Sequence, residues 1–478
     1  MAVGSSNSFD LIVLGAGTGG YSAAFKAAQL GVRVALVEAD KIGGTCLHVG
    51  CIPTKAMLES ADLFARVKGA GEFGIQLDGA PGVDFGQIAR RRGQVVGRLY
   101  KGLQGLARKN KVEFVHGRGR LKGAKKVEVE LIGEDGKPDG NRLLEANDVI
   151  LATGSRVKSL PGLVPDGKRI VTSDDVLASD RLPESLIVVG GGAVGVEFAS
   201  LYADLGTKVT VLEYLPTLVP LEDADVAREL ERSFRKRGIE VITSARFDPA
   251  AVEVGKGDVC VMVGPEGKKP QELRAEQMLV ATGRAANTDD VGLDTTRAVV
   301  ERGVVQVDQG TMRTAEPHLY AIGDIVGGLW LAHVAAHEGL AAVAAITNTE
   351  AEPVDYLKMP RATYCRPQIA SIGRSAAECE RDGLPTKSGT FPWIANGKAL
   401  IGGEYEGFAK VIAHRDTDEV LGVHLIGPHV TDLIAEASAA MLLDATAWEL
   451  AAAVHPHPTL SEAIGEAAML VEGHAINF

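Results

Sequence analysis

The 478-residue sequence lacks three features that would direct a protein to a membrane, out of the cell or onto nucleic acid. No apolar run approaches the ~18 residues that a membrane-spanning helix needs. The first ten residues contain neither a basic segment nor an apolar core, so we expect no secretion signal. The net charge of −12 argues against nucleic acid as the main partner, because phosphate binding needs a basic surface. The same charge suggests, as a hypothesis, docking to a basic segment of a larger complex.

Cysteine is also scarce, with five residues at positions 46, 51, 260, 365 and 379. An odd number in a long chain without a secretion signal fits a reducing compartment, and we predict the cytoplasm. A disulfide in such a compartment is more often catalytic than structural. The length predicts two to four domains of a globular enzyme.

Two of the cysteines, Cys46 and Cys51, lie five residues apart in the segment 43–55. In a regular helix such residues have Cα atoms roughly 8–9 Å apart, too far for a disulfide. A bonded pair therefore needs an irregular backbone, which Gly50 permits, and Pro53 suits the first turn of a helix that begins there. A thiol just before a helix also has a lowered pKa. Spacing alone leaves a redox-active disulfide and two ordinary buried cysteines equally open.

A dinucleotide-binding pattern begins near the N-terminus. It consists of a strand at 10–14, the glycines Gly15, Gly17 and Gly20, a helix to Leu30, a strand at 32–37, and Glu38. The glycines allow the backbone to approach a pyrophosphate, the helix N-terminus attracts its charge, and the acid can accept from ribose hydroxyls.

The same pattern recurs 175 residues later, with Gly190, Gly192 and Gly195 in the turn and Glu213 as the acid. Each copy continues into two alternating strands around a polar turn, at 134–138 and at 265–268, and ends in a glycine turn, at 152–155 and at 281–284. The repeat predicts two Rossmann-like domains and two dinucleotides. The acid and the final turn are 114 residues apart in the first copy and 68 in the second, and the extra 46 residues contain the cysteine pair.

The identity of each nucleotide follows from its surroundings. Glu213 would repel a 2′-phosphate, which favours NAD over NADP at the second site. The first site adjoins the cysteine pair and needs a carrier that passes two electrons between a dithiol and a hydride acceptor, which favours a flavin.

Three further polar residues have both a functional and an ordinary interpretation. Lys55 and Glu197 could pair near a flavin ring, but the residues alone favour a solvated lysine and a carboxylate that compensates the helix dipole. Asp324, at the end of a strand at 319–324, could bind a flavin polyol or form a turn.

The last third of the chain follows a boundary near Glu352–Pro353 and predicts an α+β fold, with strands at 369–372, 408–412 and 420–426 and a helix at 431–443. The apolar stripe of that helix could be core or subunit contact. We therefore predict segments at 1–155 (flavin), 156–284 (NAD), 285–352 (a return to the first domain) and 353–478 (interface).

The tail 455–462 allows competing interpretations. Thr459 and Glu462 match a capping box. Alternatively, His457 is a base oriented by Glu462, since thiolate rather than thiol attacks a disulfide. We do not expect Glu462 to serve both purposes easily. His455 and His457 lack further ligands nearby in sequence, so we predict no metal.

Taken together, these motifs resemble the flavoprotein pyridine nucleotide–disulfide oxidoreductases over nearly the whole chain. The motifs are GGTCLHVGCIPTK at 43–55, the two glycine turns, ATGS at 152–155, ATGR at 281–284, AIGD at 321–324, LAH at 331–333 and HPHPTLSE at 455–462.

The resemblance implies a role for each matching residue. Cys46 meets the substrate, Cys51 faces the flavin, Lys55 and Glu197 lie at the flavin N5, and His457 with Glu462 is the base, which reaches the disulfide of the partner subunit in a homodimer. The implied FAD contacts are the first glycine turn, Glu38, Thr45, Gly119, Thr153, Gly154, Ser155, Asp324 and Ala332. The implied NAD contacts are Gly190 to Gly195, Glu213 and Gly283.

Within the family, the resemblance implies oxidation of a protein-bound dihydrolipoamide and reduction of NAD+, in a 2-oxo acid dehydrogenase or glycine cleavage complex. A glutathione-type reductase should prefer NADPH, a mercuric-type reductase should end in a cysteine pair, and a non-catalytic flavin-bearing subunit would not need the cysteines and His457. Departures from the family pattern are His48 for Asn, Thr54 for Ser and the segment 364–368. We assign Cys365, within that segment, only a packed thiol.

Overall fold

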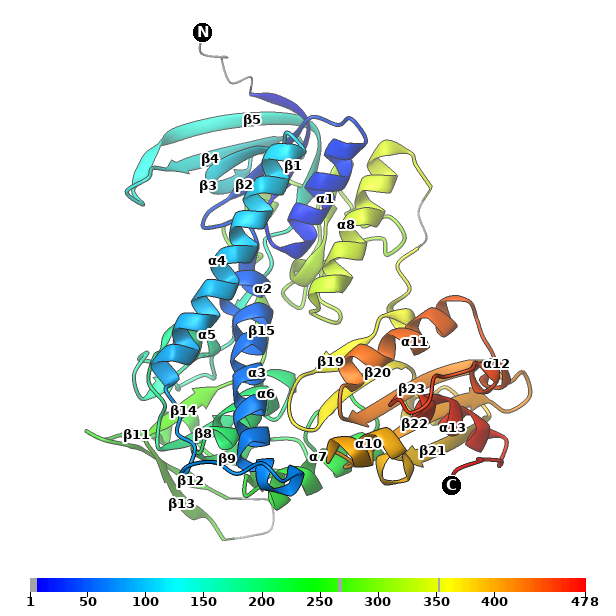
Figure 1. Ribbon diagram of the computed structural model, residues 1–478. Helices are drawn as coiled ribbons and strands as arrows, with labels where there is room; N and C mark the ends of the chain where they lie inside the picture. Colours follow the sequence, from blue (N-terminus) through cyan, green and yellow to red (C-terminus); the bar gives the residue numbers. More distant parts are fainter. Residues whose placement is uncertain (1–6, 265–268, 351–352) are drawn as a thin grey trace. The chain divides into compact units, whose positions relative to one another are not determined.

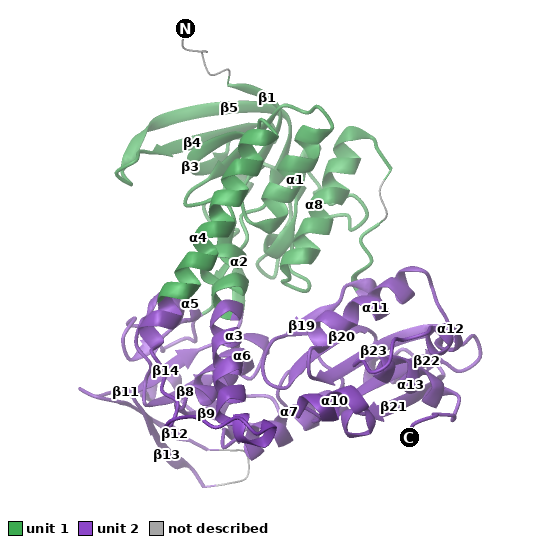
Figure 2. Ribbon diagram, viewed as in Figure 1, with its two compact units in different colours: residues 1–54, 90–158, 284–356 green, residues 55–89, 159–283, 357–478 purple. Residues whose placement is uncertain are grey.

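A computed structural model describes residues 7–264, 269–350 and 353–478 of the chain (Figure 1). The chain forms two compact units (Figure 2). Unit 1 comprises Met1–Thr54, Arg90–Lys158 and Arg284–Tyr356, and unit 2 comprises Lys55–Ala89, Ser159–Gly283 and Leu357–Phe478. The predicted turn at 265–268 and Glu352 of the predicted boundary lie outside the described residues. The division into four segments stays a prediction.

Unit 1 is built on a parallel sheet in the order β3-β2-β1-β5-β18. These strands are β1 (Ser8–Leu14), β2 (Val34–Glu38), β3 (Glu113–Leu121), β5 (Pro138–Leu151) and β18 (Leu319–Ala321). β4 (Lys126–Ile132) pairs antiparallel with β3 and β5. The strands that the sequence predicts here are confirmed, except that the strand predicted at 319–324 ends at Ala321, and Asp324 lies in the 3-10 helix Gly323–Val326 that follows. Short strands of this unit are β6 (Ser155–Val157), β15 (Arg284–Ala286), β16 (Val300–Glu301) and β17 (Val304–Val305).

Helices α1 (Thr18–Gln29) and α8 (Ala332–Thr347) pack closely in unit 1, side by side in Figure 1. An added Cβ at Gly19 would come within 2.9 Å of the Ala335 carbonyl oxygen, and one at Gly339 within 2.9 Å of the Gly19 carbonyl oxygen. Small residues at this crossing thus fix the helix that begins at the first glycine turn. The unit also holds α2 (Gly44–Val49) and most of α4 (Phe85–Lys109).

Unit 2 contains the second dinucleotide pattern as a parallel sheet in the order β10-β9-β8-β14-β7. Its strands are β7 (Ile170–Val171), β8 (Ser185–Val189), β9 (Lys208–Leu212), β10 (Glu240–Ile242) and β14 (Gln277–Val280). The helices α5 (Ser173–Ala178), α6 (Ala193–Asp204) and α7 (Ala224–Lys236) accompany it. An antiparallel sheet consists of β11 (Glu253–Val254), β12 (Val259–Val263) and β13 (Gln271–Ala275).

The C-terminal part of unit 2 is an antiparallel sheet in the order β19-β20-β23-β22-β21. Its strands are β19 (Arg361–Thr363), β20 (Gln368–Gly373), β21 (Thr386–Pro392), β22 (Phe408–His414) and β23 (Val420–Gly427). Its helices are α9 (Ala376–Arg381), α10 (Gly397–Gly402), α11 (Val430–Leu442), α12 (Ala447–Ala452) and α13 (Glu462–Val471). Ile434, Ala437 and Met441 of the predicted stripe on α11 lie in the core of this part.

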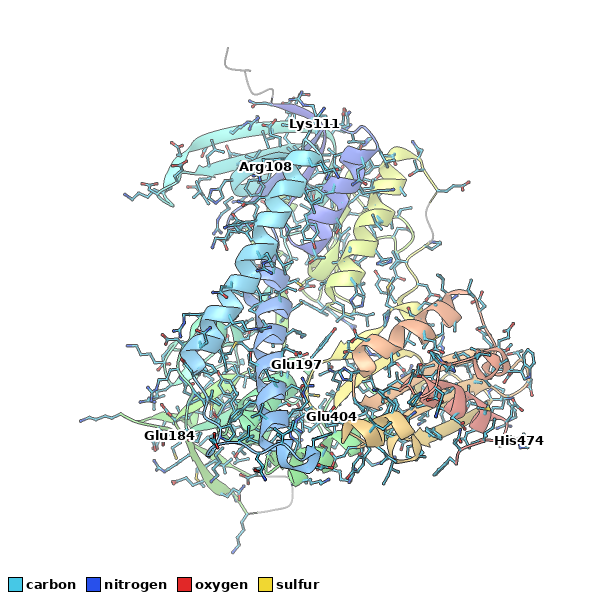
Figure 3. The ribbon with its side chains drawn as sticks, viewed as in Figure 1. Arg108, Lys111, Glu184, Glu197, Glu404 and His474 are labelled. Atoms are coloured by element: carbon cyan, nitrogen blue, oxygen red, sulfur yellow. The ribbon has the colours of Figure 1, made fainter. Side chains whose placement is uncertain are left out.

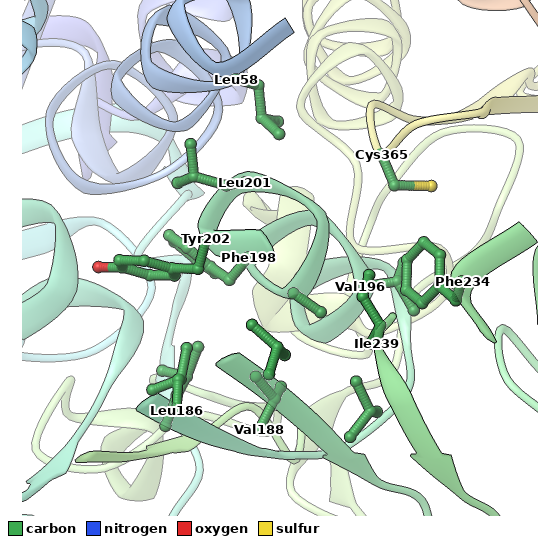
Figure 4. Packing of buried hydrophobic residues seen from close by; sticks show 14 of the residues in the cluster. Leu58, Leu186, Val188, Val196, Phe198, Leu201, Tyr202, Phe234, Ile239 and Cys365 are labelled. Atoms are coloured by element: carbon green, nitrogen blue, oxygen red, sulfur yellow. The ribbon is translucent and has the colours of Figure 1, made fainter. Parts of the chain in front are cut away.

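One hydrophobic cluster joins both parts of unit 2, together with α3 (Cys51–Lys68) (Figure 4). Leu58 of α3, Phe198 of α6 and Cys365 before β20 all belong to it. Burial raises the pKa of the Cys365 thiol well above its ordinary value. The interpretation of Cys365 as a packed thiol is therefore confirmed. Among the helices of the described residues, we find none with the length and apolar character needed to cross a bilayer.

Candidate active site

The first glycine turn connects β1 to α1. Gly15 has φ of 106°, and a Cβ there would lie 2.2 Å from the Ala152 carbonyl oxygen; a Cβ at Gly20 would lie 1.9 Å from the Gly15 carbonyl oxygen. Around Gly17, which caps α1, a Cβ would meet no atom within 4 Å. The turn thus exposes backbone and a helix N-terminus to open space, which fits the pyrophosphate of a dinucleotide.

The acid of the first copy braces this turn. Glu38 accepts from the backbone N–H of Ala16 at 2.7 Å through Oε2 and from that of Asp40 at 2.9 Å through Oε1. Each carboxylate oxygen has a second lone pair, so a ribose hydroxyl can still be accepted. The residues present fit the predicted nucleotide.

The second turn repeats this geometry in unit 2. Gly190 has φ of 110°, and a Cβ at Gly195 would lie 1.9 Å from the Gly190 carbonyl oxygen. Gly192 caps α6. Glu213 accepts from the backbone N–H of Gly191 at 2.5 Å and of Leu215 at 2.7 Å. The in-register repeat is therefore a repeat in structure as well, and the second cradle also fits a dinucleotide.

The cysteine segment packs directly on the first glycine turn. The backbone N–H of Gly43 donates to the Ala16 carbonyl oxygen at 2.8 Å. Gly44 has φ of 54°, and a Cβ there would lie 2.6 Å from the Gly17 Cα. Only glycine allows such an approach. The two motifs that the sequence shows separately form one site.

The backbone between the cysteines is irregular, as the disulfide argument predicts. α2 ends at Val49, Gly50 departs from helical geometry, and α3 begins at Cys51. The helix begins two residues before the predicted Pro53, which lies in its first turn. The structure carries the half-buried Cys46 and Cys51 as thiols, so the disulfide, which is the oxidised form of this pair, stays a prediction.

Two departures from the family pattern stabilise this segment. The Nε2 atom of His48 lies 3.0 Å from the Ile42 carbonyl oxygen, and its ring meets Tyr100 of α4 edge-on at 5.3 Å. The hydroxyl of Thr54 donates to the Gly50 carbonyl oxygen at 2.6 Å. His48 thus holds the residue that precedes the Gly43–Gly44 turn.

A polar cluster lies at the end of β18 in unit 1. Ser155 donates to Asp324 and accepts from Nε of Arg284 at 2.6 Å. The Arg284 Nε also lies 3.9 Å from the Asp324 carboxylate. Two predicted flavin contacts, 169 residues apart, therefore lie together. The sequence alone indicates no role for Arg284, although this residue closes the ATGR motif at 281–284.

The turn after β18 depends on a buried carboxyl that the sequence did not reveal. Glu338 of α8 accepts from the backbone N–H of Gly323 at 2.5 Å and from the Tyr356 hydroxyl at 2.8 Å. Burial, together with nearby Asp324, raises the pKa of Glu338 to about 7, against the lowering effect of the two donors. Glu338 lies five residues after the quoted LAH motif, in an Ala-rich helix that gives no sign of a buried acid.

Lys55 and Glu197 form a close ion pair within unit 2. The Lys55 Nζ lies 2.8 Å from both carboxylate oxygens, and Glu197 also accepts from the Tyr364 N–H at 2.9 Å. The Glu197 side chain is only 7% exposed, and it is the fifth residue of α6, beyond the first turn. The ordinary interpretations, a solvated lysine and dipole compensation, are therefore wrong. Lys55 follows Cys51 by one turn on α3.

His457 and Glu462 also form the predicted pair. The Nδ1 atom of His457 lies 2.8 Å from Glu462 Oε1, while the backbone N–H of Thr459 donates to Oε2 at 2.8 Å. Each oxygen of the Glu462 carboxylate thus accepts from one donor. The Thr459 side chain does not complete a capping box; it donates to the Pro456 carbonyl oxygen, and Ser461 precedes α13.

The charge state of Glu462 suits an orienting role. Burial raises its pKa, but the Thr459 N–H and the His457 imidazole outweigh burial, and the pKa lies below the usual value. An ionised Glu462 keeps a proton on Nδ1 and leaves Nε2 of His457 to act as a base. The His457 side chain is 79% exposed. The nearby His455 instead contacts Glu436 at 2.6 Å, and among the described residues no three or more His, Cys, Asp or Glu side chains cluster in a way that could hold a metal ion.

The other predicted contacts lie near these groups or in packing positions. Thr45 is the second residue of α2, and Ala332 is the first of α8. Thr153 donates to the Asn287 carbonyl oxygen at 2.9 Å, and Gly154 and Gly283 have φ of 69° and 103°. A Cβ at Gly119 would lie 2.4 Å from Leu14 Cδ1, so this glycine lies in a tightly packed position of the core.

Comparison with known proteins decides the family. Residues 9–339 match the family described as pyridine nucleotide-disulphide oxidoreductase, and residues 359–468 match its dimerisation domain. The chain belongs to this family. The oxidoreductase is 45% identical to the dihydrolipoyl dehydrogenase of Bacillus subtilis (strain 168) over 474 residues, which cover 98% of this chain and 99% of that protein. It is 40% identical to the dihydrolipoyl dehydrogenase of Zymomonas mobilis over 472 residues, which cover 98% and 99% of the two chains.

Solved structures agree with this assignment. The crystal structure of LpdA from Mycobacterium tuberculosis matches the oxidoreductase with a TM-score of 0.88 at 30% identity, covering 96% of this chain and 99% of that one. The flavoprotein disulfide reductase RclA of Escherichia coli matches with a TM-score of 0.85 at 24% identity, which shows the fold alone. The predicted family, the α/β class with a dimerisation domain, and FAD and NAD(H) as cofactors are confirmed. The roles of single residues stay predictions.

Proposed function

We propose that this oxidoreductase oxidises a protein-bound dihydrolipoamide and reduces NAD+, with Cys46 and Cys51 as a redox-active disulfide. The observation that carries the proposal is the packing of the cysteine segment on the first glycine turn through Gly43 and Gly44. This packing would position a dithiol beside a dinucleotide bound at the first turn, while no cysteine segment packs on the second turn. The dihydrolipoyl dehydrogenases among its relatives support the choice of substrate.

The side chains supply proton transfer and thiol exchange. His457 takes a proton from the substrate dithiol through Nε2, while Glu462 stabilises the imidazolium at Nδ1. The substrate thiolate attacks the Cys46 sulfur, which forms a mixed disulfide and releases Cys51 as a thiolate. The second substrate thiol then closes the substrate disulfide and leaves the enzyme as a dithiol. The substrate is thus oxidised by two electrons and the Cys46–Cys51 disulfide is reduced by two.

Residues at the two glycine turns would hold the two cofactors. FAD supplies a carrier that accepts two electrons from a dithiol and donates hydride to NAD+. Glu38, Ser155 and Asp324 would hold it at the first turn, and Glu213 would hold NAD+ at the second. Lys55, fixed by Glu197 at 2.8 Å, would present a positive charge beside the flavin ring.

The assembly follows from the family. The dimerisation domain supports a homodimer, and the 79% exposure of the His457 side chain leaves its imidazole available to a partner subunit's disulfide. We also propose a lipoyl-bearing subunit of a 2-oxo acid dehydrogenase or glycine cleavage complex as the substrate carrier. The cytoplasm stays the predicted compartment, on the odd number of five cysteines.

A steady-state comparison tests the substrate. We expect turnover with dihydrolipoamide and NAD+, and little with glutathione disulfide and NADPH, because the Glu213 carboxylate would repel a 2′-phosphate. The visible spectrum of the protein should show bound flavin. Preferred turnover of glutathione disulfide with NADPH would contradict the proposal.

Single variants test the assigned residues. Cys46→Ser should lower NAD+ reduction by dihydrolipoamide about 1000-fold or more, because no mixed disulfide forms. His457→Gln should lower it about 100- to 1000-fold, since no base generates the thiolate. Both variants should keep the flavin spectrum. Activity near that of the wild type in either one would exclude the assigned role.

A further inference from the structure

Helix α4 has a charge opposite to that of the chain as a whole. Its 25 residues contain no Asp or Glu, whereas the chain has a net charge of −12. The basic residues of α4 are Arg90, Arg91, Arg92, Arg98, Lys101, Arg108 and Lys109. A helix with like charges at these spacings is weakened by repulsion. The stability of the helix therefore does not explain this run of basic residues.

All of these cations except Arg92 share one face of the helix. At 100° per residue they fall within an arc of about 100°, and the stripe is about 28 Å long at 1.5 Å per residue. The opposite face carries Tyr100 and Ala107, which pack in or against the core of unit 1. We call the six cations on the outer face, Arg90, Arg91, Arg98, Lys101, Arg108 and Lys109, the basic stripe.

The cations in the C-terminal half of the stripe are available to a partner. Arg98, Lys101, Arg108 and Lys109 are exposed, and no ion pair involves them among the residues that the structure describes. Figure 3 labels Arg108, with Lys111 beyond the helix end. Lysines of the β3–β4 hairpin differ, since Lys122 and Lys126 pair with Glu128 and Glu145 at 2.9 and 2.8 Å. Compensation of the helix dipole can explain only the last turn, with Arg108 and Lys109.

Two glycines leave part of this face of α4 without side chains. Gly102 and Gly105 lie on the side of the stripe, and a Cβ at either would meet no atom within 4 Å. Packing within the chain does not require them, and each costs about 1 kcal/mol of helix stability relative to Ala. At these two glycine positions, between Lys101 and Arg108, another molecule can approach the helix backbone closely.

The stripe lies one helix width from the cysteine segment. The Tyr100 ring on the inner face of α4 meets His48 of α2 at 5.3 Å, and α2 carries Cys46. A helix with its side chains is ~10 Å across. A molecule on the outer face therefore lies close to the dithiol without covering it.

We propose that the basic stripe of α4 docks an acidic domain that carries the dihydrolipoyl group. The inference rests on the proposed function, and charge complementarity selects the occupant. A nucleic acid fits less well, because the net charge of −12 repels an extended polyanion beyond the stripe. Docking would concentrate the carrier beside the cysteine segment. The composition suggested that the acidic chain docks to a basic segment of a larger complex, whereas here a basic helix of the chain docks an acidic domain.

The test uses the holoenzyme with Arg98→Glu and Lys101→Glu combined. Its substrates are free dihydrolipoamide and an isolated, reduced lipoyl domain of net negative charge. At low ionic strength we expect kcat/KM for the lipoyl domain to fall about tenfold and kcat/KM for free dihydrolipoamide to stay unchanged. Salt should reduce the difference between wild type and variant. Fluorescence anisotropy should show the same loss in binding of the labelled lipoyl domain.

A matched control carries the same charge change elsewhere in unit 1. Lys125→Glu with Lys137→Glu alters two exposed lysines on the β3–β4 and β4–β5 turns and should bind the lipoyl domain as the wild type does. Unchanged binding in the stripe variant would overturn the proposal, as would an equal loss in the control or with free dihydrolipoamide. Preferential binding of a short DNA duplex by the wild type would also overturn it. Absence of turnover with free dihydrolipoamide in the wild type would instead contradict the proposed function, while the binding measurement still tests the docking.

Discussion

The two glycine turns have nearly the same geometry and differ in the segment that is packed on them. The Ala16 carbonyl oxygen of the first turn accepts from the Gly43 N–H at 2.8 Å. The equivalent oxygen of the second turn, 175 residues later at Gly191, accepts from the Val219 N–H at 2.8 Å. The first donor belongs to the cysteine segment. The second belongs to a loop whose Leu218 side chain lies against Gly191.

This difference teaches where the chemistry of the enzyme resides. Both cradles offer the same glycines, helix N-terminus and braced acid, so nucleotide binding is common to both. The two sites differ in the segment that donates a hydrogen bond to the second residue of the turn. In the first copy that segment carries the cysteines, and in the second copy it does not. Changes at matched positions of the two copies should therefore have separable consequences.

Substitution of the third glycine of each turn should separate flavin binding from NAD+ reduction most strongly. A Cβ at Gly20 or Gly195 would lie 1.9 Å from a backbone carbonyl oxygen in either copy, and the turn must shift. We expect Gly20→Ala to lose the flavin absorbance. Gly195→Ala should keep it and still respond to dihydrolipoamide, while NAD+ reduction falls about 100-fold because the cradle is displaced. Visible spectra and steady-state rates measure both.

A control for substitution of glycine itself is Gly93→Ala on α4, where a Cβ would meet no atom within 4 Å. This variant should keep both the flavin and the rate. Loss of flavin from Gly195→Ala, or normal flavin in Gly20→Ala, would show that the two cradles are not independent.

A second difference between the copies is the return segment, which adds β18 and α8 to the first sheet only. Glu338 of α8 holds the turn after β18, and burial raises its pKa to about 7. In the unfolded chain an ordinary glutamate loses its proton near pH 4.3. The folded state therefore binds more protons between these values, and its stability is full below the lower value and falls as pH rises to about 7.

Glu338→Gln should remove this pH dependence and keep an acceptor for the Gly323 N–H. Relative to the variant, the wild type should lose up to about 3 kcal/mol of stability between pH 4.5 and pH 7.5. The measurement is the difference between their thermal unfolding midpoints at each pH. A difference that stays constant across this range would mean that Glu338 does not titrate there.

The features that the sequence predicted depend on short-range geometry. The glycine turns follow from steric requirements at fixed spacing, and the break at Gly50 follows from the reach of a disulfide across five residues. Both are rules that a few neighbouring residues satisfy by themselves.

The features that the sequence did not predict depend on long-range packing. Lys55 and Glu197 are 142 residues apart; the residues alone favoured other interpretations, and only the family resemblance favoured their pairing. Nothing local marks Arg284 as the partner of Ser155, or Glu338 as a buried acid. At Glu462 the residues allowed either a capping box or a partner for His457, and the structure forms the pair with His457 while the capping box stays incomplete.

The smallest expected effects come from substituting Glu38 and Glu213, the acids that accept hydrogen bonds from the two turns. Glu38→Gln and Glu213→Gln each replace one accepting oxygen with an amide that donates, so one backbone N–H of the turn loses its partner, at a cost of about 1–3 kcal/mol. We expect Glu38→Gln to weaken flavin retention about tenfold and leave the KM for NAD+ unchanged. Glu213→Gln should raise that KM about tenfold and leave the flavin in place. Flavin release on dilution and the KM for NAD+ measure the two effects. If either variant changed both quantities equally, the acids would act through the fold as a whole, and the likeness of the two turns would not extend to separate binding sites.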